Sequence, residues 1–101
     1  MAVGLVLQIA GMSRREYDAV SAQLNIDQQT GKGDWPPGLL SHAAGAADDG
    51  SWVVIETWES RDAQGRFMQE RLGSALQAGG VSATPQITWV DLVANHRLGA
   101  A

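Results

Sequence analysis

His42 and Glu56 are the two side chains of this sequence best suited to proton transfer. Histidine has a reference pKa near 6.5, so it accepts and returns a proton at neutral pH and suits an acid, a base or an orienting donor at a phenol or enol. Glu56 falls on the same face of a predicted strand as Trp52 and Trp58, which favours either a partnered structural carboxylate or a base with a raised pKa. For His42 the competing interpretation is a structural histidine that bonds across a sheet or at a subunit surface.

The turn between two strand-like runs decides whether these two side chains meet. Asp48-Asp49-Gly50 is a turn signal, so the runs on either side predict a hairpin. A three-residue turn at 48–50 pairs position 42 with 56, whereas a two- or four-residue loop pairs it with 55 or 57. A slip of one residue moves a side chain to the opposite face, and the sequence leaves the register open.

Tryptophans are the other residues that could line a site. Trp58 and Trp89 fall in strand patterns, where packing in a core or subunit interface competes with a stacking wall for a flat aromatic ligand. Trp35 lies in the polar stretch 30–38, where it either plugs the edge of the core or belongs to a loop that covers a pocket. Tyr17 is assigned a packing role, as a hydrophobic staple with Met12, rather than that of a catalytic phenol.

The composition excludes several other chemistries. The chain has no cysteine, so disulfides and thiolate metal sites are excluded. No serine lies in a nucleophile elbow, and the glycines of residues 31–38 precede a strand rather than a helix, which excludes a phosphate loop. His42 and His96 lack the spacing of metal ligands, so we expect no metal site.

Charge and hydropathy limit the classes of partner that the protein could bind. Seven basic and eleven acidic residues give a net charge of −4, which disfavours nucleic acid as a partner. No apolar run reaches the ~18 residues of a membrane span. The apolar N-terminus lacks a basic start, so we expect a strand rather than a signal peptide, and a cytoplasmic protein with no membrane partner.

The elements that would position these residues form one domain, residues 1–101. Alternating apolar residues predict four strands, over Ala2–Ala10, Leu39–Ala46, Ser51–Glu59 and Gln86–Val93. The first strand is apolar on both faces, which is typical of a central strand covered on both sides.

Two helices and a loop separate the strands. A capping box at Ser13 and Glu16 begins the first helix, which we expect to end near Ile26 or up to four residues later. Residues 30–38, with three glycines and two prolines, are predicted to hold no strand pairing. Ser60 begins the second helix and Gly79-Gly80 ends it. Gly73-Ser74 is a possible break, with Ser74 capping a short continuation.

The order β-α-β-β-α-β predicts an α+β, ferredoxin-like fold with a four-stranded antiparallel sheet. Both helices lie on one face, because the crossovers are right-handed. We expect the uncovered face to carry Trp and Val side chains of the third strand. An exposed apolar sheet of this size predicts a partner, most economically a second copy in a homodimer with the sheets face to face.

Several motifs resemble one known family. Residues 37–45, PGLLSHAAG, and residues 53–60, VVIETWES, followed by Phe67, are similar to the antibiotic-biosynthesis-monooxygenase-like branch of the dimeric α+β barrel superfamily. Tyr17-Asp18 and Pro85-Gln86-Ile87 fit the same pattern, so the resemblance covers nearly the whole chain. It implies a homodimer with a ligand cleft in each copy, between the sheet and the helices or loops.

The resemblance implies a cofactor-independent monooxygenase acting on a small flat aromatic or phenolic substrate. The deprotonated substrate itself reduces oxygen, so the protein needs only a base, a donor for the anion and a dry cleft. On this interpretation His42 and Glu56 are the catalytic candidates. The candidates for substrate binding are Trp58, Trp89, Trp35 and Leu40. The alternative is a non-catalytic dimeric module that binds a small molecule or serves a stress-related role.

Overall fold

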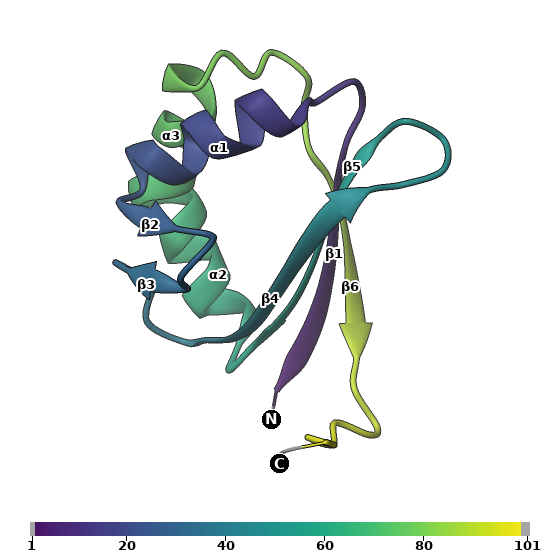
Figure 1. Ribbon diagram of the computed structural model, residues 1–101. Coiled ribbons are helices and arrows are strands. Elements are labelled where there is room, and N and C mark those ends of the chain that lie inside the picture. The colour runs from purple at the N-terminus through teal and green to yellow at the C-terminus, as the bar shows by residue number, and fades with distance from the viewer. Residues whose placement is uncertain (1, 100–101) are drawn as a thin grey trace.

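The computed structural model describes residues 2–99. A four-stranded antiparallel sheet, in the order β4-β5-β1-β6, carries the helices on one of its faces (Figure 1). Its strands are β1 (Val3–Ile9), β4 (Leu39–Ala46), β5 (Trp52–Trp58) and β6 (Gln86–Asp91). The ferredoxin-like α+β prediction is therefore confirmed, whereas its dimeric part concerns a second copy and stays a prediction.

The first helix, α1 (Arg14–Gln23), begins as predicted but ends early. The Ser13 side chain accepts a hydrogen bond from the Glu16 N–H, and the Glu16 side chain accepts one from the Ser13 N–H, which completes the capping box. Leu24 caps the other end, and Asn25 adopts a left-handed φ of 59°. Asparagine tolerates that conformation better than most residues, so the chain turns there and the helix stops.

A short ribbon follows α1 where the sequence predicted no strand pairing. β2 (Ile26–Asp27) pairs with β3 (Lys32–Gly33), so that prediction was wrong for the first part of residues 30–38. The Asp27 carboxylate accepts the backbone N–H groups of Gln29 and Thr30 and thereby closes the turn. Gly33 has a φ of 136°, and a Cβ there would overlap the Asn25 carbonyl oxygen, so this close pairing requires glycine.

The second helical segment is continuous rather than broken. α2 (Arg61–Phe67) begins at Ser60, whose side chain accepts the Ala63 N–H, and passes through a π-helical turn, η1 (Met68–Leu72), into α3 (Gly73–Ala78). The predicted break at Gly73-Ser74 is wrong, because Leu72 and Gly73 both keep α-helical backbone angles, and α3 starts at Gly73 without a side-chain cap. A Cβ on Gly73 would lie 3.1 Å from the Met68 carbonyl oxygen, so glycine lets the wide turn close. Gly79 ends α3 as predicted.

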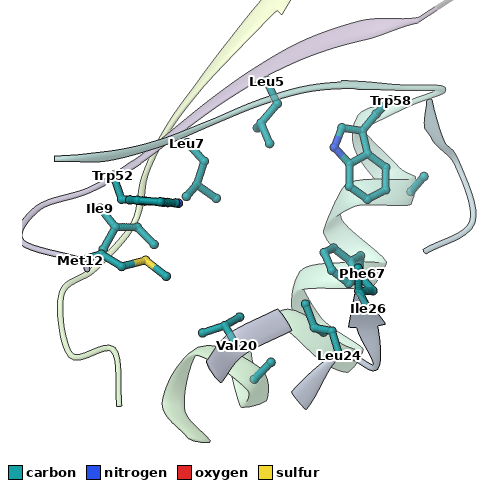
Figure 2. Close-up of a cluster of buried hydrophobic side chains, with 12 residues drawn as sticks. Leu5, Leu7, Ile9, Met12, Val20, Leu24, Ile26, Trp52, Trp58 and Phe67 are labelled. Atoms are coloured by element: carbon teal, nitrogen blue, oxygen red, sulfur yellow. The ribbon is translucent and has the colours of Figure 1, made fainter. Parts of the chain in front are cut away.

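The core lies between the sheet and the helices. The largest fully buried side chains are Trp58, Leu5 and Ile9, and Figure 2 shows Leu5, Leu7, Ile9 and Trp52 facing the helical layer. The β1–β5 register places inner-face residues opposite one another, as in the pair Ile9 and Trp52. The tryptophans of β5 therefore belong to the covered face.

The open face differs from its prediction in composition. It carries no β5 tryptophan, since Val53, Ile55 and Thr57 are the outward residues of that strand. Ile55 is 57% exposed and Val90, on β6, is 41% exposed. The open face thus exposes apolar side chains, as expected, but these are valine and isoleucine, and the hydrogen-bonded hydroxyls of Ser41 and Thr57 lie on the same face.

Candidate active site

The β4–β5 turn sets the register of the site. The Ala47 N–H donates to the Ser51 carbonyl oxygen across a three-residue turn at 48–50 (2.8 Å), and His42 lies opposite Glu56. Of the registers that the sequence left open, this is the one that puts both side chains on the inner face. They project from neighbouring strands toward the helices.

A chain of hydrogen bonds joins α1 to β4 and β5. Tyr17 Oη lies 2.6 Å from His42 Nε2, and His42 Nδ1 lies 2.7 Å from Glu56 Oε2. Trp58 Nε1 donates to Glu56 Oε1 over 2.9 Å. An indole can only donate, so Glu56 accepts on that oxygen, and as a carboxylate it accepts from Nδ1–H on the other. Nε2 is then left as the acceptor of the Tyr17 hydroxyl proton.

This chain borders a small cavity between the sheet and the helices. The cavity measures about 60 Å³, and most of its wall is apolar, with Leu7, Ile9 and Phe67 among the residues that form it. Tyr17 and His42 contribute polar atoms to the same wall. Hydrogen bonds in apolar surroundings are stronger than in water, because few water molecules compete for the same donors and acceptors.

Burial affects the ionisation of Tyr17. Burial itself, and then the nearby charges of Glu56 and Asp18, raise the pKa of Tyr17 to about 12. The phenol therefore keeps its proton at neutral pH. It acts as a donor to His42 rather than as a phenolate.

Trp35 borders both this cavity and an outer hollow. Its ring lies 5.4 Å from the His42 ring, and its Nε1 donates to the Gly31 carbonyl oxygen (2.8 Å). Trp35, Leu39 and His42 line both the cavity and an outer hollow of about 360 Å³.

Arg71, in the π-helical turn, holds the segment that carries Trp35. Its guanidinium donates to the carbonyl oxygen of Leu24 (2.8 Å) and to that of Asp34 (2.7 Å). One side chain thus ties the end of α1 to the residue before Trp35. These two bonds hold the residue before Trp35 close to the end of α1.

The predicted substrate-binding residues fall in different places. Trp35 lines the cavity, whereas Trp58 is fully buried behind Glu56 and does not line it. Leu40 is 45% exposed and lines only the outer hollow. Trp89, on β6, lies under the Arg61 guanidinium (5.3 Å) and is not part of the cavity wall. The structure thus brings His42, Glu56 and Trp35 together.

Sequence reasoning missed two residues of the cavity wall, Tyr17 and Trp52. Tyr17 was assigned to packing, yet a staple residue at the fourth helical position points toward the sheet, where a phenol can also meet a histidine. Trp52 shares the inner face of β5 with Glu56, as the two-residue period indicated. Its ring lies 5.0 Å from that of Tyr17.

Two further searches cover the described part of the chain. Within residues 2–99, no group of three or more His, Asp or Glu side chains gathers as a metal ion would need. In the same range no helix is long and apolar enough to cross a membrane.

Comparisons with known proteins bear on the fold. No protein-family model and no curated protein matches the chain. Solved structures do match. Rv0793 from Mycobacterium tuberculosis has a TM-score of 0.67 at 16% identity, over 96% of this chain and 100% of that one. A variant of SnoaB, a cofactor-independent oxygenase from Streptomyces nogalater, has a TM-score of 0.62 at 16% identity, over 93% and 95% of the two chains.

A third match carries the family's name. A protein from Caulobacter crescentus that is named as an antibiotic biosynthesis monooxygenase has a TM-score of 0.64 at 18% identity, over 92% of this chain and 91% of that one. The chain has the fold of the antibiotic biosynthesis monooxygenases. At these identities the likeness concerns the fold, so the chemistry must be argued from the residues of the cavity.

Proposed function

We propose that this protein is a cofactor-independent monooxygenase that oxidises a small aromatic substrate with an acidic phenol or enol. The observation that carries the proposal is the hydrogen-bonded chain from Tyr17 through His42 to Glu56, which ends on an apolar cavity. The fold shared with SnoaB, itself described as a cofactor-independent oxygenase, supports the same class of reaction. Burying such a chain is costly, so a use for it is expected.

The chain can remove a proton from the substrate. The substrate hydroxyl donates to Tyr17 Oη while Tyr17 passes its own proton to His42 Nε2. The imidazolium that forms is held by Glu56, and Trp58 stabilises the same carboxylate from behind. The product of this step is an aromatic anion in surroundings that exclude water.

Dioxygen is the oxidant in the following step. The anion gives one electron to O₂, and the resulting radical and superoxide combine into a carbon–oxygen bond, leaving a peroxide on the ring carbon. For a ring CH₂, loss of water from that peroxide gives a carbonyl. The peroxide takes back the proton from the His42 imidazolium, so one oxygen atom stays in the product and the other leaves as water with that proton and the hydrogen that remained on the ring carbon.

The size of the cavity limits how the substrate enters. A cavity of about 150 Å³ is needed to hold a benzene ring. The cavity here is about 60 Å³, and the outer hollow beyond Trp35 is about 360 Å³. We therefore include displacement of Trp35 in the proposal, because it joins the two spaces beside His42.

A homodimer is the second part of the proposal. The open face exposes Ile55 and Val90, and the Leu92 side chain covers Gly4 on the same face, where an added Cβ would lie 3.1 Å from Leu92. Exposed apolar side chains gathered on one sheet face are typical of an interaction surface. We assign that surface to a second copy of the chain, sheet against sheet.

The test is aerobic oxidation of a hydroxyanthrone by chelator-treated protein, followed as quinone absorbance and oxygen uptake. We expect turnover, and a fall in kcat of about 10²–10⁴-fold in His42→Ala, the range of general base catalysis. Tyr17→Phe should fall in the same direction, while Gln69→Ala, an exposed residue of η1, should match the wild type. Trp35→Ala should raise kcat/KM, because it opens the cavity.

Two results would contradict the proposal. Unchanged turnover in both His42→Ala and Tyr17→Phe would remove the relay from the mechanism. Binding of the hydroxyanthrone without oxygen uptake, in the wild type and in Trp35→Ala alike, would favour the non-catalytic binding module instead.

A further inference from the structure

Tyr17 is the only tyrosine of the chain, and its hydroxyl lies in hydrogen-bond contact with a base. Its Oη is 2.6 Å from His42 Nε2, and the Glu56 carboxylate holds the same ring at Nδ1 over 2.7 Å. Burial raises the pKa of Tyr17 to about 12, so the phenol keeps its proton at neutral pH. A protonated phenol beside an imidazole nitrogen can pass that proton on without the help of water.

The same contact suits the loss of an electron from the phenol. A phenol that loses one electron becomes a strong acid, so the electron leaves readily where a base takes the proton at once. His42 Nε2 is that base, and Glu56 stabilises the imidazolium that forms. The electron leaves the ring, whereas the proton moves only from Oη to Nε2 and can return when the ring is reduced.

Two tryptophan rings lie beside this pair. The Trp52 ring is 5.0 Å from the Tyr17 ring, and the Trp35 ring is 5.4 Å from the His42 ring. Indoles and phenols are among the protein side chains that lose one electron most readily. Trp52 is 7% exposed, whereas Trp35 is only half-buried and borders the outer hollow. An oxidised Trp35 at the surface is therefore next to the Tyr17–His42 pair.

Trp89 lies in different surroundings. It belongs to β6, which is the edge strand opposite β4, and its ring lies 5.3 Å from the guanidinium carbon of Arg61. A positive charge over an indole opposes the removal of an electron from it. The part of the sheet that carries His42 is therefore better suited to one-electron oxidation than the β6 edge.

We propose that Tyr17 is a redox-active tyrosine that reduces oxygen-centred radicals, with His42 as the acceptor of its proton and Trp35 as the contact to the surface. A peroxyl or alkoxyl radical takes the electron and becomes an anion, which is protonated by water. Tyr17 becomes a neutral phenoxyl radical while its proton stays on His42. A soluble reductant of the thiol or ascorbate class then returns an electron, and the proton moves back to Oη.

This role goes beyond the proposed oxygenase, because it needs no aromatic substrate. Its test is flash photolysis of the full chain with a ruthenium tris(bipyridine) photo-oxidant, followed by transient absorption. Tryptophan and phenoxyl radicals absorb at different wavelengths, so each is followed separately. In the wild type we expect the tryptophan radical to decay as the phenoxyl radical forms. The rate should not depend on buffer concentration, since His42 takes the proton.

The variants test each residue of the path. His42→Ala should slow formation of the phenoxyl radical about 10²-fold, at the lower end of what a positioned base contributes, and added imidazole should restore the rate. Trp35→Phe should slow it severalfold, whereas Trp89→Phe, the matched control at the opposite edge, should keep the wild-type rate. Tryptophan radicals that persist in the wild type without a phenoxyl radical would overturn the inference. A wild-type rate in His42→Ala, or in Trp35→Phe, would overturn it as well.

A measurement on the wild type alone covers the case in which His42→Ala does not fold. The radical is trapped by freezing after photolysis and studied by electron–nuclear double resonance. Because the chain has one tyrosine, the phenoxyl signal belongs to Tyr17. We expect a proton coupled to the phenoxyl oxygen that disappears in D₂O, and a radical without it would contradict His42 as the acceptor.

The two proposals fail separately. Neither measurement uses a hydroxyanthrone, so the redox role of Tyr17 stands if the protein proves not to be an oxygenase. Turnover of a hydroxyanthrone by a protein that forms no phenoxyl radical would overturn only the present inference.

Discussion

The inner face of the sheet buries a carboxylate and a histidine, whereas the outer face of the same strands exposes isoleucine and valine. Along β5 the two sets alternate: Glu56 is 8% exposed and its neighbour Ile55 is 57% exposed. A strand that served a monomeric core alone would carry the opposite pattern, apolar inward and polar outward. The inner face carries polar side chains where that pattern has apolar ones, and the outer face carries apolar side chains where it has polar ones.

The departures differ in what they require. On the inner face the polar atoms satisfy one another, since Tyr17, His42, Glu56 and Trp58 form one chain of bonds. Within residues 2–99, Trp52 Nε1 is the buried side-chain nitrogen or oxygen that has no hydrogen-bond partner. On the outer face no such internal solution exists for Ile55 and Val90. The polar groups of the inner face thus pair largely within the chain, whereas the apolar side chains of the outer face are exposed.

Replacing tryptophan by alanine should give the largest difference in stability between a central strand, β5, and an edge strand, β6. Trp58→Ala should lower the free energy of unfolding by about 3–5 kcal/mol, because it removes the largest buried side chain and the donor to Glu56. Trp89→Ala, at the half-buried residue of the otherwise exposed edge strand β6, should cost about 1 kcal/mol. Urea unfolding followed by circular dichroism measures both. Equal losses would mean that β6 and β5 contribute alike to the core.

Glu56→Ala should give the next largest effect. The change leaves the Trp58 N–H and the His42 Nδ1–H without an acceptor, and a loss of about 2–3 kcal/mol in the free energy of unfolding is expected. Glu59→Ala, three residues on and exposed, is the matched control and should stay within about 0.5 kcal/mol of the wild type. Similar values for the two variants would show that the chain of bonds adds no stability.

A charge on the outer face should act on assembly instead of on folding. Ile55→Lys should weaken the proposed homodimer by about 1–2 kcal/mol per copy, because a lysine at the centre of an apolar interface loses its water. Light scattering across a dilution series measures the dissociation, and Gln69→Lys on the helical side is the control. A wild type that is monomeric at tens of micromolar would remove the dimer from the proposal.

Much of this contrast was readable from local patterns. The two-residue period of β5 separated Glu56 from Ile55, and the capping box located the start of α1. The sequence did not indicate which face of β5 the helices cover, so the tryptophans of that strand were assigned to the open face. The register was not readable either, because the turn signal at 48–50 fits loops of different lengths. The backbone conformation that decides between them, including a φ of 86° at Gly50, does not follow from the residue types alone.

The site itself depends on contacts that no window of sequence contains. Tyr17 and His42 are 25 residues apart, and their bond follows from the distance between α1 and the edge strand β4. The π-helical turn that places Arg71 and Leu72 has no sequence signature that we could apply. The unpaired Trp52 N–H is visible only once every neighbouring acceptor has been placed.

The smallest predicted effect concerns a single proton on the inner face. Tyr17 is the only tyrosine, so its ultraviolet absorbance titrates alone, and the midpoint should lie at a pKa of about 12 instead of about 10. Burial is the main cause, followed by the charges of Glu56 and Asp18, so Glu56→Gln should lower the midpoint more than Asp18→Asn. A wild-type midpoint near the ordinary value would place the phenol in water and disconnect it from His42.

The same titration predicts the sign of a stability change. Between about pH 10 and 12 the unfolded chain has lost the Tyr17 proton while the folded chain retains it, so the folded state binds more protons. The free energy of unfolding therefore falls as the pH rises through this window, and the contribution is fully present below it. Urea unfolding of the wild type and Tyr17→Phe at both ends of the window measures the difference. If the free energy of unfolding declines equally in the two proteins, other groups cause the loss, and the pKa of Tyr17 is not raised by burial.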